Sequence, residues 1–329
     1  METTPNLPLI SVIIPAFNSE NTIERACRSV LEQSYSNAEL VVVDDGSADN
    51  TAQIVRDLSY EDNRIKLISQ ENYGVCKARN VGMDHAEGDY LFFLDSDDEL
   101  TSDALDKMYH MAVQYQAEVV TGGFMNVFPD GKEWPDSYGL EQPVVWENTE
   151  FLSHSLADHM ATHSACAKLY RSTLAKNVQF VEGRRIHEDG FYVFEIALQQ
   201  PKTVVVDLPV IRRYFRKMVP GQIVYSEKLY DMLYFGKRKY QIVSERFPQM
   251  LPQAKNIVVK AALATLNTIR LVDDSRVNDL ETDCIDIIRE YAEAFIPASF
   301  KDKITFWVAR MGLYRLYKYV YNIYLTIRK

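Results

Sequence analysis

The sequence is poor in the features that mark exported and disulfide-stabilised proteins. It has four cysteines, Cys27, Cys76, Cys166 and Cys284, which lie far apart and form no CxxC pair. This spacing excludes a dense disulfide scaffold and favours reduced thiols. The first residues also lack the basic segment and the small-residue cleavage site of an export signal. We therefore expect a cytoplasmic protein.

Positive charge is scarce over most of the chain. The 329 residues contain 46 acidic and 36 basic side chains, a net charge of −10. Residues 301–329 depart from this pattern, because they hold seven Lys and Arg against one acid and carry +6, which leaves −16 for the rest. Phosphate contacts need clustered positive charge, so this acidic body argues against a nucleic-acid partner.

Apolar runs alternate with helical patterns in the first part of the chain. Runs at 7–17, 40–43, 65–68 and 90–94 predict strands, and apolar side chains at helical spacing predict helices after Asn18 and over 51–58, 75–86 and 102–116. A long β segment follows at 118–128. This alternation predicts an α/β fold with a Rossmann-like, mostly parallel, doubly wound sheet. Such sheets bind ligands beyond the carboxyl ends of their strands.

The alternation weakens after residue 128, and we expect irregular structure up to about residue 177. A helix over 188–199 and a strand over 203–214 then complete the sheet domain, and the sequence from about 225 onward is mostly helical. We therefore expect two domains: a catalytic domain over 1–222, and a helical C-terminal region over 223–329.

Acidic clusters follow two of the expected strands. Asp44 and Asp45 stand at the end of a strand before Gly46, and the alternative to a functional site here is a turn and a helix cap, the commonest use of Asp-Gly-Ser. The segment DSDD at 95–98 follows the apolar run YLFFL, and its negative charges need a compensating cation. Asp95 and Asp97 offer the oxygen ligands that Mg²⁺ or Mn²⁺ shares with a diphosphate. The alternative is that residues 96–98 cap the next helix.

Four segments together resemble glycosyltransferase family 2 in their order and spacing: SVIIPAFNSEN (11–21), VVVDDGSADNT (41–51), NYGVCKARNVG (72–82) and GDYLFFLDSDD (88–98). AKLYRS (167–172) and HEDGFY (187–192) extend the resemblance to bacterial capsular, exo- and lipopolysaccharide-type members. RRYFRKMVPGQIVYS (212–226) is a looser match, and the last hundred residues or so show no such resemblance.

The resemblance implies a GT-A fold, a UDP-sugar donor and a divalent metal, Mn²⁺ or Mg²⁺. It implies that Asp45, with Asp44 beside it, accepts a hydrogen bond from the uracil imide, and that Asp97 binds the metal. Arg79 would contact the base and ribose and also neutralise Asp95. The complete set implied to bind the nucleotide-sugar is Pro15, Phe17, Glu20, Asp44, Asp45, Asn72, Arg79, Asp95 and Ser96.

Inversion at the anomeric carbon requires a general base that takes the proton of the acceptor hydroxyl. Glu188 and Asp189 resemble the family's acidic pair at the start of a helix. We assign Asp189 as the base, and Glu188 as a residue that orients the acceptor or the loop. The alternative is an acidic helix start, which the helix dipole favours in any protein.

The basic tail has the pattern of one amphipathic helix. Arg315 and Lys318 fall on one face, and the opposite face carries Phe306, Ala309, Leu313, Leu316, Val320, Tyr324 and Ile327. A basic, aromatic-rich helix of this kind favours an anionic membrane surface. Its charges argue against a membrane-spanning helix. The alternative is a helix that packs on protein.

Taken together, these features predict an inverting hexosyl- or N-acetylhexosaminyl-transferase, peripheral on the inner face of the cell membrane. Its acceptor would be an oligosaccharide or lipid-linked glycan in bacterial surface polysaccharide synthesis, and a homodimer stays open. A processive synthase is disfavoured because there is no QxxRW motif. A sugar nucleotidyltransferase would need a Gly-rich loop where PAFNSEN stands. A catalytically inactive, partner-binding homologue would be expected to lose Asp97 or Asp189.

Overall fold

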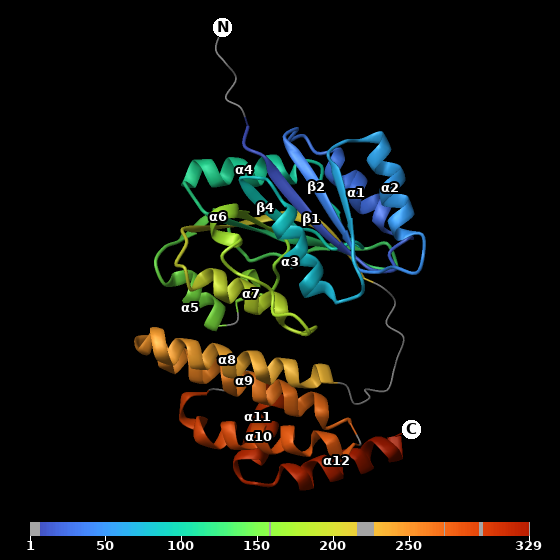
Figure 1. Ribbon diagram of the computed structural model, residues 1–329. Helices are drawn as coiled ribbons and strands as arrows, with labels where there is room; N and C mark the ends of the chain where they lie inside the picture. Colours follow the sequence, from blue (N-terminus) through green and yellow to red (C-terminus); the bar gives the residue numbers. More distant parts are fainter. Residues whose placement is uncertain (1–6, 158, 216–226, 273, 296–298, 329) are drawn as a thin grey trace. The chain divides into compact units, whose positions relative to one another are not determined.

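The computed structural model describes residues 7–157, 159–215, 227–272, 274–295 and 299–328 (Figure 1). The chain divides into two compact units, one of residues 1–155 and 159–218 and the other of residues 156–158 and 219–329. The expected boundary between 222 and 223 lies outside the described residues.

The first unit is built on one sheet with the strand order β3-β2-β1-β4-β9-β6-β10-β5. Strands β1 (Ile10–Ala16), β2 (Ala38–Asp44), β3 (Ile65–Ser69) and β4 (Tyr90–Phe93) are parallel, as are β6 (Val119–Val127) and β10 (Thr203–Tyr214). Strand β9 (Lys168–Arg171) is antiparallel to both β4 and β6, so these two point the same way. The predicted mostly parallel α/β sheet is confirmed.

The region expected to be irregular contains strands that the sequence pattern did not reveal. Besides β9, these are β7 (Glu133–Pro135), which pairs with β6, and β8 (Val144–Trp146), which pairs with β10. Strand β5 (Glu99–Leu100) pairs with β10 directly after the acidic loop. These strands have two to four residues, too few for a period-2 pattern to be recognised.

Helices cover both faces of the sheet. Tyr90 of β4 meets Tyr109 of α4 (Ala104–Tyr115), with ring centroids 6.0 Å apart, whereas Phe93 meets Tyr192 of α7 (Glu188–Ala197) at 5.7 Å. Positions 90 and 93 of a strand point to opposite faces, so α4 and α7 lie on opposite sides. The other helices of this unit are α1 (Ile23–Leu31), α2 (Thr51–Glu61), α3 (Val75–His85), α5 (Glu150–Leu156) and α6 (Ser172–Ala175).

The second unit is helical. Its helices are α8 (Asp231–Arg246), α9 (Leu251–Ile269), α10 (Asn278–Glu290), α11 (Phe300–Arg310) and α12 (Tyr314–Arg328). Its core draws on all five, with Leu233, Leu263, Ile288, Phe306 and Tyr314 among the buried side chains. None of the helices in the described residues is long and apolar enough to cross a membrane.

The expectation of one amphipathic tail helix is wrong. Gly312, with φ of +76°, separates α11 from α12. Phe306 and Ala309 are buried in the core, whereas Leu313, Leu316 and Val320 from the same predicted face are exposed. The break at Gly312 changes which side of the helix faces the core. The side chains of Tyr324 and Ile327 lie outside the described residues.

Helix α3 lies close against β1. A Cβ atom added at Gly82 would come within 2.3 Å of Ile13 Cγ2 and 3.5 Å of Val43 Cγ2. The position therefore has no room for even a methyl group, and a larger residue would push α3 away from the sheet.

We expect Gly82→Ala to lower the free energy of unfolding by about 1–3 kcal/mol, because the added methyl overpacks the contact between α3 and β1. Chemical denaturation measures this change. Asp84→Ala, at an exposed position of the same helix, is the matched control and should change the value by less than about 0.5 kcal/mol. Equal stabilities of the two variants would contradict the close packing.

Candidate functional site

A cavity of about 220 Å³ lies where β1, β2 and β4 end. It is lined by Pro15, Ala16, Phe17, Asp45, Val75, Ala78, Asp95, Ser96 and Asp97. Six of the residues expected to bind the nucleotide-sugar or the metal are in this set. They converge because parallel strands bring their carboxyl ends to one edge of the sheet. Val75 and Ala78 come from the first turns of α3, which closes the cavity.

Asp45 is buried and holds the loop that leads into α3. Its Oδ1 accepts hydrogen bonds from Gln70 Nε2 (2.7 Å) and the Tyr73 amide (2.9 Å), and its Oδ2 accepts one from the Gly74 amide (2.8 Å). An ionised carboxylate accepts about four hydrogen bonds, so these three bonds leave room for one more. Asp45 therefore supports the loop and still has capacity to bind a ligand N–H.

Asp44 and Asn72, which lie next to Asp45 and Tyr73 in the sequence, do not line the cavity. Asp44 Oδ1 accepts the Ser47 amide at 3.3 Å, which matches the turn interpretation of the Asp-Gly-Ser sequence. Asn72 is exposed. A Cβ atom added at Gly46 would lie 2.8 Å from the backbone nitrogen of Asn72. With φ of +74° and no space for a side chain, position 46 suits glycine alone.

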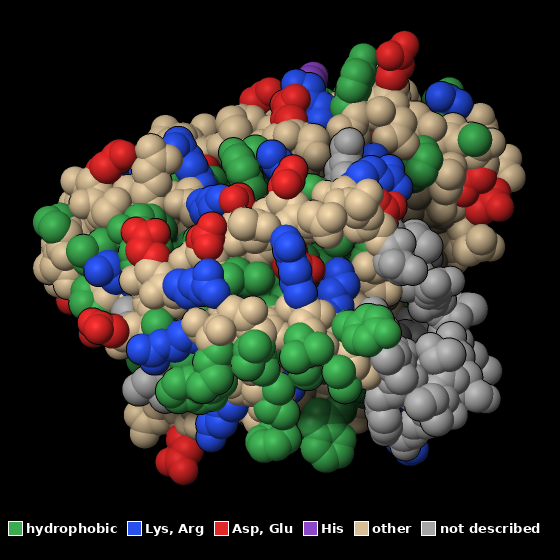
Figure 2. Space-filling view, turned by 90° about the horizontal axis from the view of Figure 1, so that it is seen from below, with side chains coloured by type: hydrophobic (Ala, Val, Ile, Leu, Met, Phe, Trp, Pro, Cys, Tyr) green, Lys and Arg blue, Asp and Glu red, His purple; other side chains and the backbone are tan. Residues whose placement is uncertain are grey.

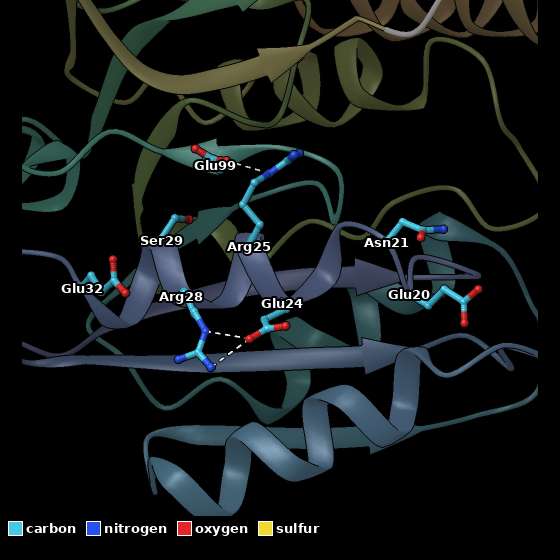
Figure 3. A pocket seen from close by; sticks show the side chains of 8 residues that line it. All are labelled: Glu20, Asn21, Glu24, Arg25, Arg28, Ser29, Glu32 and Glu99. Atoms are coloured by element: carbon cyan, nitrogen blue, oxygen red, sulfur yellow. Dashed lines mark hydrogen bonds and ion pairs between the residues drawn. The ribbon is translucent and has the colours of Figure 1, made fainter.

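Glu20 lies away from the cavity. Its carboxylate accepts hydrogen bonds from the backbone amide (3.1 Å) and the side chain (2.9 Å) of Asn50. Glu20 lines a separate depression of about 480 Å³ along α1, where it points away from the arginines (Figure 3). Both arginines there are paired, Arg25 with Glu99 and Arg28 with Glu24. The geometry thus gives Glu20 a role in the loop around Asn50.

The loop after β4 is held at three points. Ser96 Oγ lies 2.8 Å from Ser19 Oγ, the Asp97 carbonyl accepts a bond from Arg25 (2.6 Å), and Asp98 Oδ1 accepts the Tyr214 amide (3.0 Å). Burial raises the pKa of Asp98 to about 7. The alternative that residues 96–98 cap the next helix is wrong, because β5 intervenes and α4 begins only at Ala104.

The carboxylates of this loop fit a divalent ion that a ligand helps to hold. Within the described residues, no group of three or more His, Cys, Asp or Glu side chains is arranged as a metal site. Asp95 and Asp97 both line the cavity. Mg²⁺ typically binds one or two carboxylates together with substrate phosphates, so this donor set suits an ion shared with a diphosphate.

Arg79 is buried, with 3% of its surface exposed, and it joins the cavity to the helix that carries the predicted base. Its Nη2 donates to Asp95 Oδ1 (3.0 Å), and its Nη1 donates to Asp189 and lies 3.5 Å from Glu188. Burial disfavours the charge, but the carboxylates of Asp189 and Asp95 raise the pKa of Arg79 well above its ordinary value. The predicted pairing with Asp95 is present, and the guanidinium does not line the cavity.

Asp189 and Glu188 stand in the first turn of α7, beside Arg79. Asp189 Oδ1 takes the bond from Arg79, while its Oδ2 accepts longer bonds from the Ala165 amide (3.3 Å) and Ser164 Oγ (3.4 Å). Burial, together with the charge of Asp189, raises the pKa of Glu188. Both acidic residues therefore interact with Arg79. Acidic residues placed at a helix start only by the helix dipole would not require this interaction.

The sequence interpretation did not identify the residues behind Asp189. Lys168 is almost fully buried, and its Nζ donates to the Ser164 carbonyl at 2.6 Å. Burial lowers the pKa of Lys168 to about 8. The lysine thereby holds the loop whose Ser164 and Ala165 contact Asp189. Its inward position depends on β9, the short strand that the pattern did not reveal.

Known proteins resemble the chain in both sequence and fold. Residues 11–178 match the profile described as Glycosyl transferase family 2. "Glycosyltransferase GlyA" of Streptococcus pneumoniae is 32% identical over 218 residues, which cover 63% of this chain and 31% of that protein. "GalNAc(5)-diNAcBac-PP-undecaprenol beta-1,3-glucosyltransferase" of Campylobacter jejuni is 39% identical over 178 residues, covering 54% of this chain and 56% of that one. The chain thus spans less than two thirds of the length of either relative.

A solved structure shows that the fold is shared over nearly the whole chain. The crystal structure of Staphylococcus aureus TarS 1-349 in complex with UDP-GlcNAc superposes with a TM-score of 0.68 at 21% identity. The match covers 96% of this chain and 91% of that one. The expected GT-A fold, with its helical C-terminal region, is confirmed.

We expect Arg79→Ala to lower the free energy of unfolding by about 3–5 kcal/mol, because it leaves Asp95 and Asp189 partly buried without their counter-ion. Arg79→Lys should recover only part of this loss, since one ammonium group does not reach both carboxylates in the way that the planar guanidinium does. Denaturation curves of the three proteins measure the effect. Full recovery by lysine would contradict a bridging role.

Proposed function

The chain belongs to glycosyltransferase family 2, and we propose that it transfers one sugar from a UDP-sugar to a glycan acceptor, with inversion at the anomeric carbon. The observation that carries this proposal is the bridge made by Arg79, which places the cavity carboxylate Asp95 and the predicted base Asp189 on one guanidinium. A donor site and a base held at a fixed spacing are what a single displacement needs.

In this proposal the nucleotide occupies the cavity. The remaining acceptor capacity of Asp45 receives the N–H of the uracil imide, and Pro15 and Phe17 supply apolar surface for the base. Asp97 would hold Mn²⁺ or Mg²⁺ together with the diphosphate, and Asp95 would contact the ribose or a water bound to the metal. The metal, when bound, offsets the negative charge that builds on the departing UDP. The structure of TarS, which has a similar fold and contains UDP-GlcNAc, supports a UDP-sugar as the donor class.

Asp189 acts as the general base in the proposed reaction. The acceptor oxygen bonds to the anomeric carbon while the bond from that carbon to the UDP oxygen breaks, and Asp189 takes the acceptor hydroxyl proton. We assign the proton to Oδ2, because its two hydrogen bonds are long while Oδ1 is held by Arg79. An α-linked donor then gives a β-linked product.

We further propose that the acceptor is a lipid-linked glycan of a bacterial surface polysaccharide, to which the enzyme adds one hexose or N-acetylhexosamine. The support comes from the names of relatives: one is a glucosyltransferase acting on an undecaprenol-linked glycan, and another is the "Minor teichoic acid biosynthesis protein GgaA" of Bacillus subtilis, 28% identical over 257 residues. A lipid-linked acceptor would bring the reaction to a membrane surface.

An exposed apolar face in the second unit supports membrane contact. Six large side chains with exposed fractions between 48% and 66% follow one another from α11 into α12: Trp307, Met311, Leu313, Leu316, Tyr319 and Val320. Exposed Lys303, Arg310 and Arg315 come from the same two helices. Figure 2 shows apolar side chains gathered in one area, with Lys and Arg side chains around it. We call this set the α11–α12 face.

An anionic lipid surface fits this face better than a protein does. Aromatic and aliphatic side chains enter the interface between headgroups and acyl chains, and each basic residue near anionic headgroups contributes about 1 kcal/mol. The face differs from the stripe predicted from the sequence, because Phe306 and Ala309 are in the core. We propose that the enzyme binds the membrane peripherally through the α11–α12 face.

Asp97→Asn should abolish metal-dependent binding of UDP, because it removes a ligand of the ion that the diphosphate shares. Asp189→Asn should leave UDP binding intact but lower the rate of sugar transfer about a hundredfold or more, since it removes the base. Calorimetry with UDP and Mn²⁺, repeated with EDTA, measures the first effect, and turnover of UDP-sugars measures the second. Metal-independent binding, or full activity of Asp189→Asn, would overturn these assignments.

The chain should sediment with vesicles that contain phosphatidylglycerol and stay in solution with vesicles of phosphatidylcholine alone. Trp307→Ser combined with Leu316→Ser should abolish this binding, because both changes remove apolar surface from the α11–α12 face. Val113→Ser, at an exposed position of α4, is the control and should have no effect. If the double variant binds like the unmodified protein, or if the unmodified chain instead self-associates through this face, the membrane proposal is wrong.

A further inference from the structure

Three exposed aromatic side chains lie together on one face of neighbouring strands β7, β6 and β10. Trp134 on β7 and Arg213 on β10 both lie opposite Asn126 of β6. Phe128 and Phe215 come directly after the last residues of β6 and β10, two positions beyond Asn126 and Arg213. Alternate positions of an extended segment share a face. The Phe128 and Phe215 rings stack with centroids 5.1 Å apart and planes at 10°. We call these three residues the aromatic platform.

Arg213 lies on the same face as the platform and holds its surroundings, while the three rings stay exposed. Arg213 donates to Asn126 Oδ1 (2.7 and 3.0 Å) and to Asp136 (2.7 Å), and its guanidinium carbon is 5.2 Å from the centre of the Phe215 ring. The Phe215 amide donates to the Val127 carbonyl at 2.9 Å. Even so, Phe128, Phe215 and Trp134 remain 39%, 43% and 69% exposed. Fixed aromatic rings that face solvent are a common element of binding sites.

The strand order places the platform next to the proposed reaction centre. Strands β6 and β10 run in the same direction as β1, β2 and β4, so Phe128 and Phe215 lie at the edge of the sheet where the cavity lies. The Tyr214 amide donates to Asp98 at 3.0 Å, and thus the residues before Phe215 and after Asp97 are hydrogen-bonded to each other. The platform borders the loop that carries Asp97.

The same strand order puts the platform on the side from which an acceptor must come. Along the sheet, Asp45 follows β2, Phe17 follows β1, and the loop with Asp97 follows β4. Beyond β4, and after β9, come β6 and β10 with the platform. Asp45, proposed to bind the base, and the platform therefore lie on opposite sides of Asp97 in the strand order. Inversion requires the acceptor to approach the anomeric carbon from the side away from the nucleotide.

We propose that the aromatic platform is an acceptor subsite that binds one pyranose ring of a glycan. The apolar C–H face of a pyranose stacks on flat aromatic rings, while its hydroxyls need polar partners at the rim. Asp136, whose side chain is 39% exposed and accepts a hydrogen bond from Arg213, supplies such a partner. This inference rests on the proposed function, because it assumes that the acceptor is a glycan, and it names residues that hold it.

Saturation-transfer NMR on the full chain tests the proposal, with UDP and Mg²⁺ present. The probes are the methyl β-glycosides of glucose, galactose, N-acetylglucosamine and N-acetylgalactosamine. We expect at least one to bind, with saturation strongest on the C–H protons of one ring face. Phe128→Ala and Trp134→Ala should each weaken its binding about tenfold, because each removes a stacking surface. Phe128→Tyr, which keeps the ring, should bind as the unmodified chain does.

Tyr60→Ala removes an aromatic ring from α2 that is 80% exposed, more than any ring of the platform, and is the control, with no expected effect. The proposal is overturned if none of the glycosides binds the unmodified chain, or if binding survives in both alanine variants. It is also overturned if Phe128→Leu, which preserves apolar volume in case Phe128→Ala unfolds, binds like the unmodified chain. UDP binding in the same samples reports on the donor site, so a failure of the platform proposal can be distinguished from a failure of the proposed donor site.

Discussion

The site depends on the ion pairs that the buried guanidinium of Arg79 makes with the carboxylates around it. A buried charge is stable only when opposite charges and hydrogen bonds replace the water it has lost. Arg79 finds these partners in Asp95, from the loop after β4, and in Asp189 and Glu188, from α7. These parts of the chain are distant in sequence, so the arginine has its partners only when the sheet, α3 and α7 are all assembled.

The same assembly also positions the rest of the site through contacts within the protein. Gly82 lets α3 approach β1 closely, which sets the depth at which Arg79 lies. Asp45 fixes the loop before α3 through three hydrogen bonds, and Asp98 ties the acidic loop to β10. Most carboxylates of this edge therefore have a structural partner as well as a proposed role. Preorganisation of this kind lowers the cost of orienting a substrate.

The second unit shows how a buried charge also decides which surface stays exposed. Glu281 of α10 is buried, and it pairs with Arg315 and Lys318 of α12. Lys318 is largely covered in this pair, whereas Arg315 reaches Glu281 but stays 71% exposed. Leu316 and Val320 of the same helix are exposed. The apolar surface left exposed is the α11–α12 face. The basic residues of the tail thus have two uses, one within the unit and one at its surface.

The sequence by itself determined the strands β1 to β4, β6 and β10, because their apolar runs are long enough to show a pattern. It also determined the family, because Asp45, Asp95 and Asp97 follow these strands in matched segments. The expected GT-A fold followed from the same residues.

Only the tertiary structure decided the relations between distant residues. It placed Glu20 on Asn50 and Arg79 between two carboxylates, and it gave Lys168 its buried position on β9. It also divided the tail at Gly312, so that one predicted face became partly core and partly surface. Local patterns record which side chains alternate along an element. The partner that a side chain meets depends on strand order and helix packing, which bring together residues far apart in the chain.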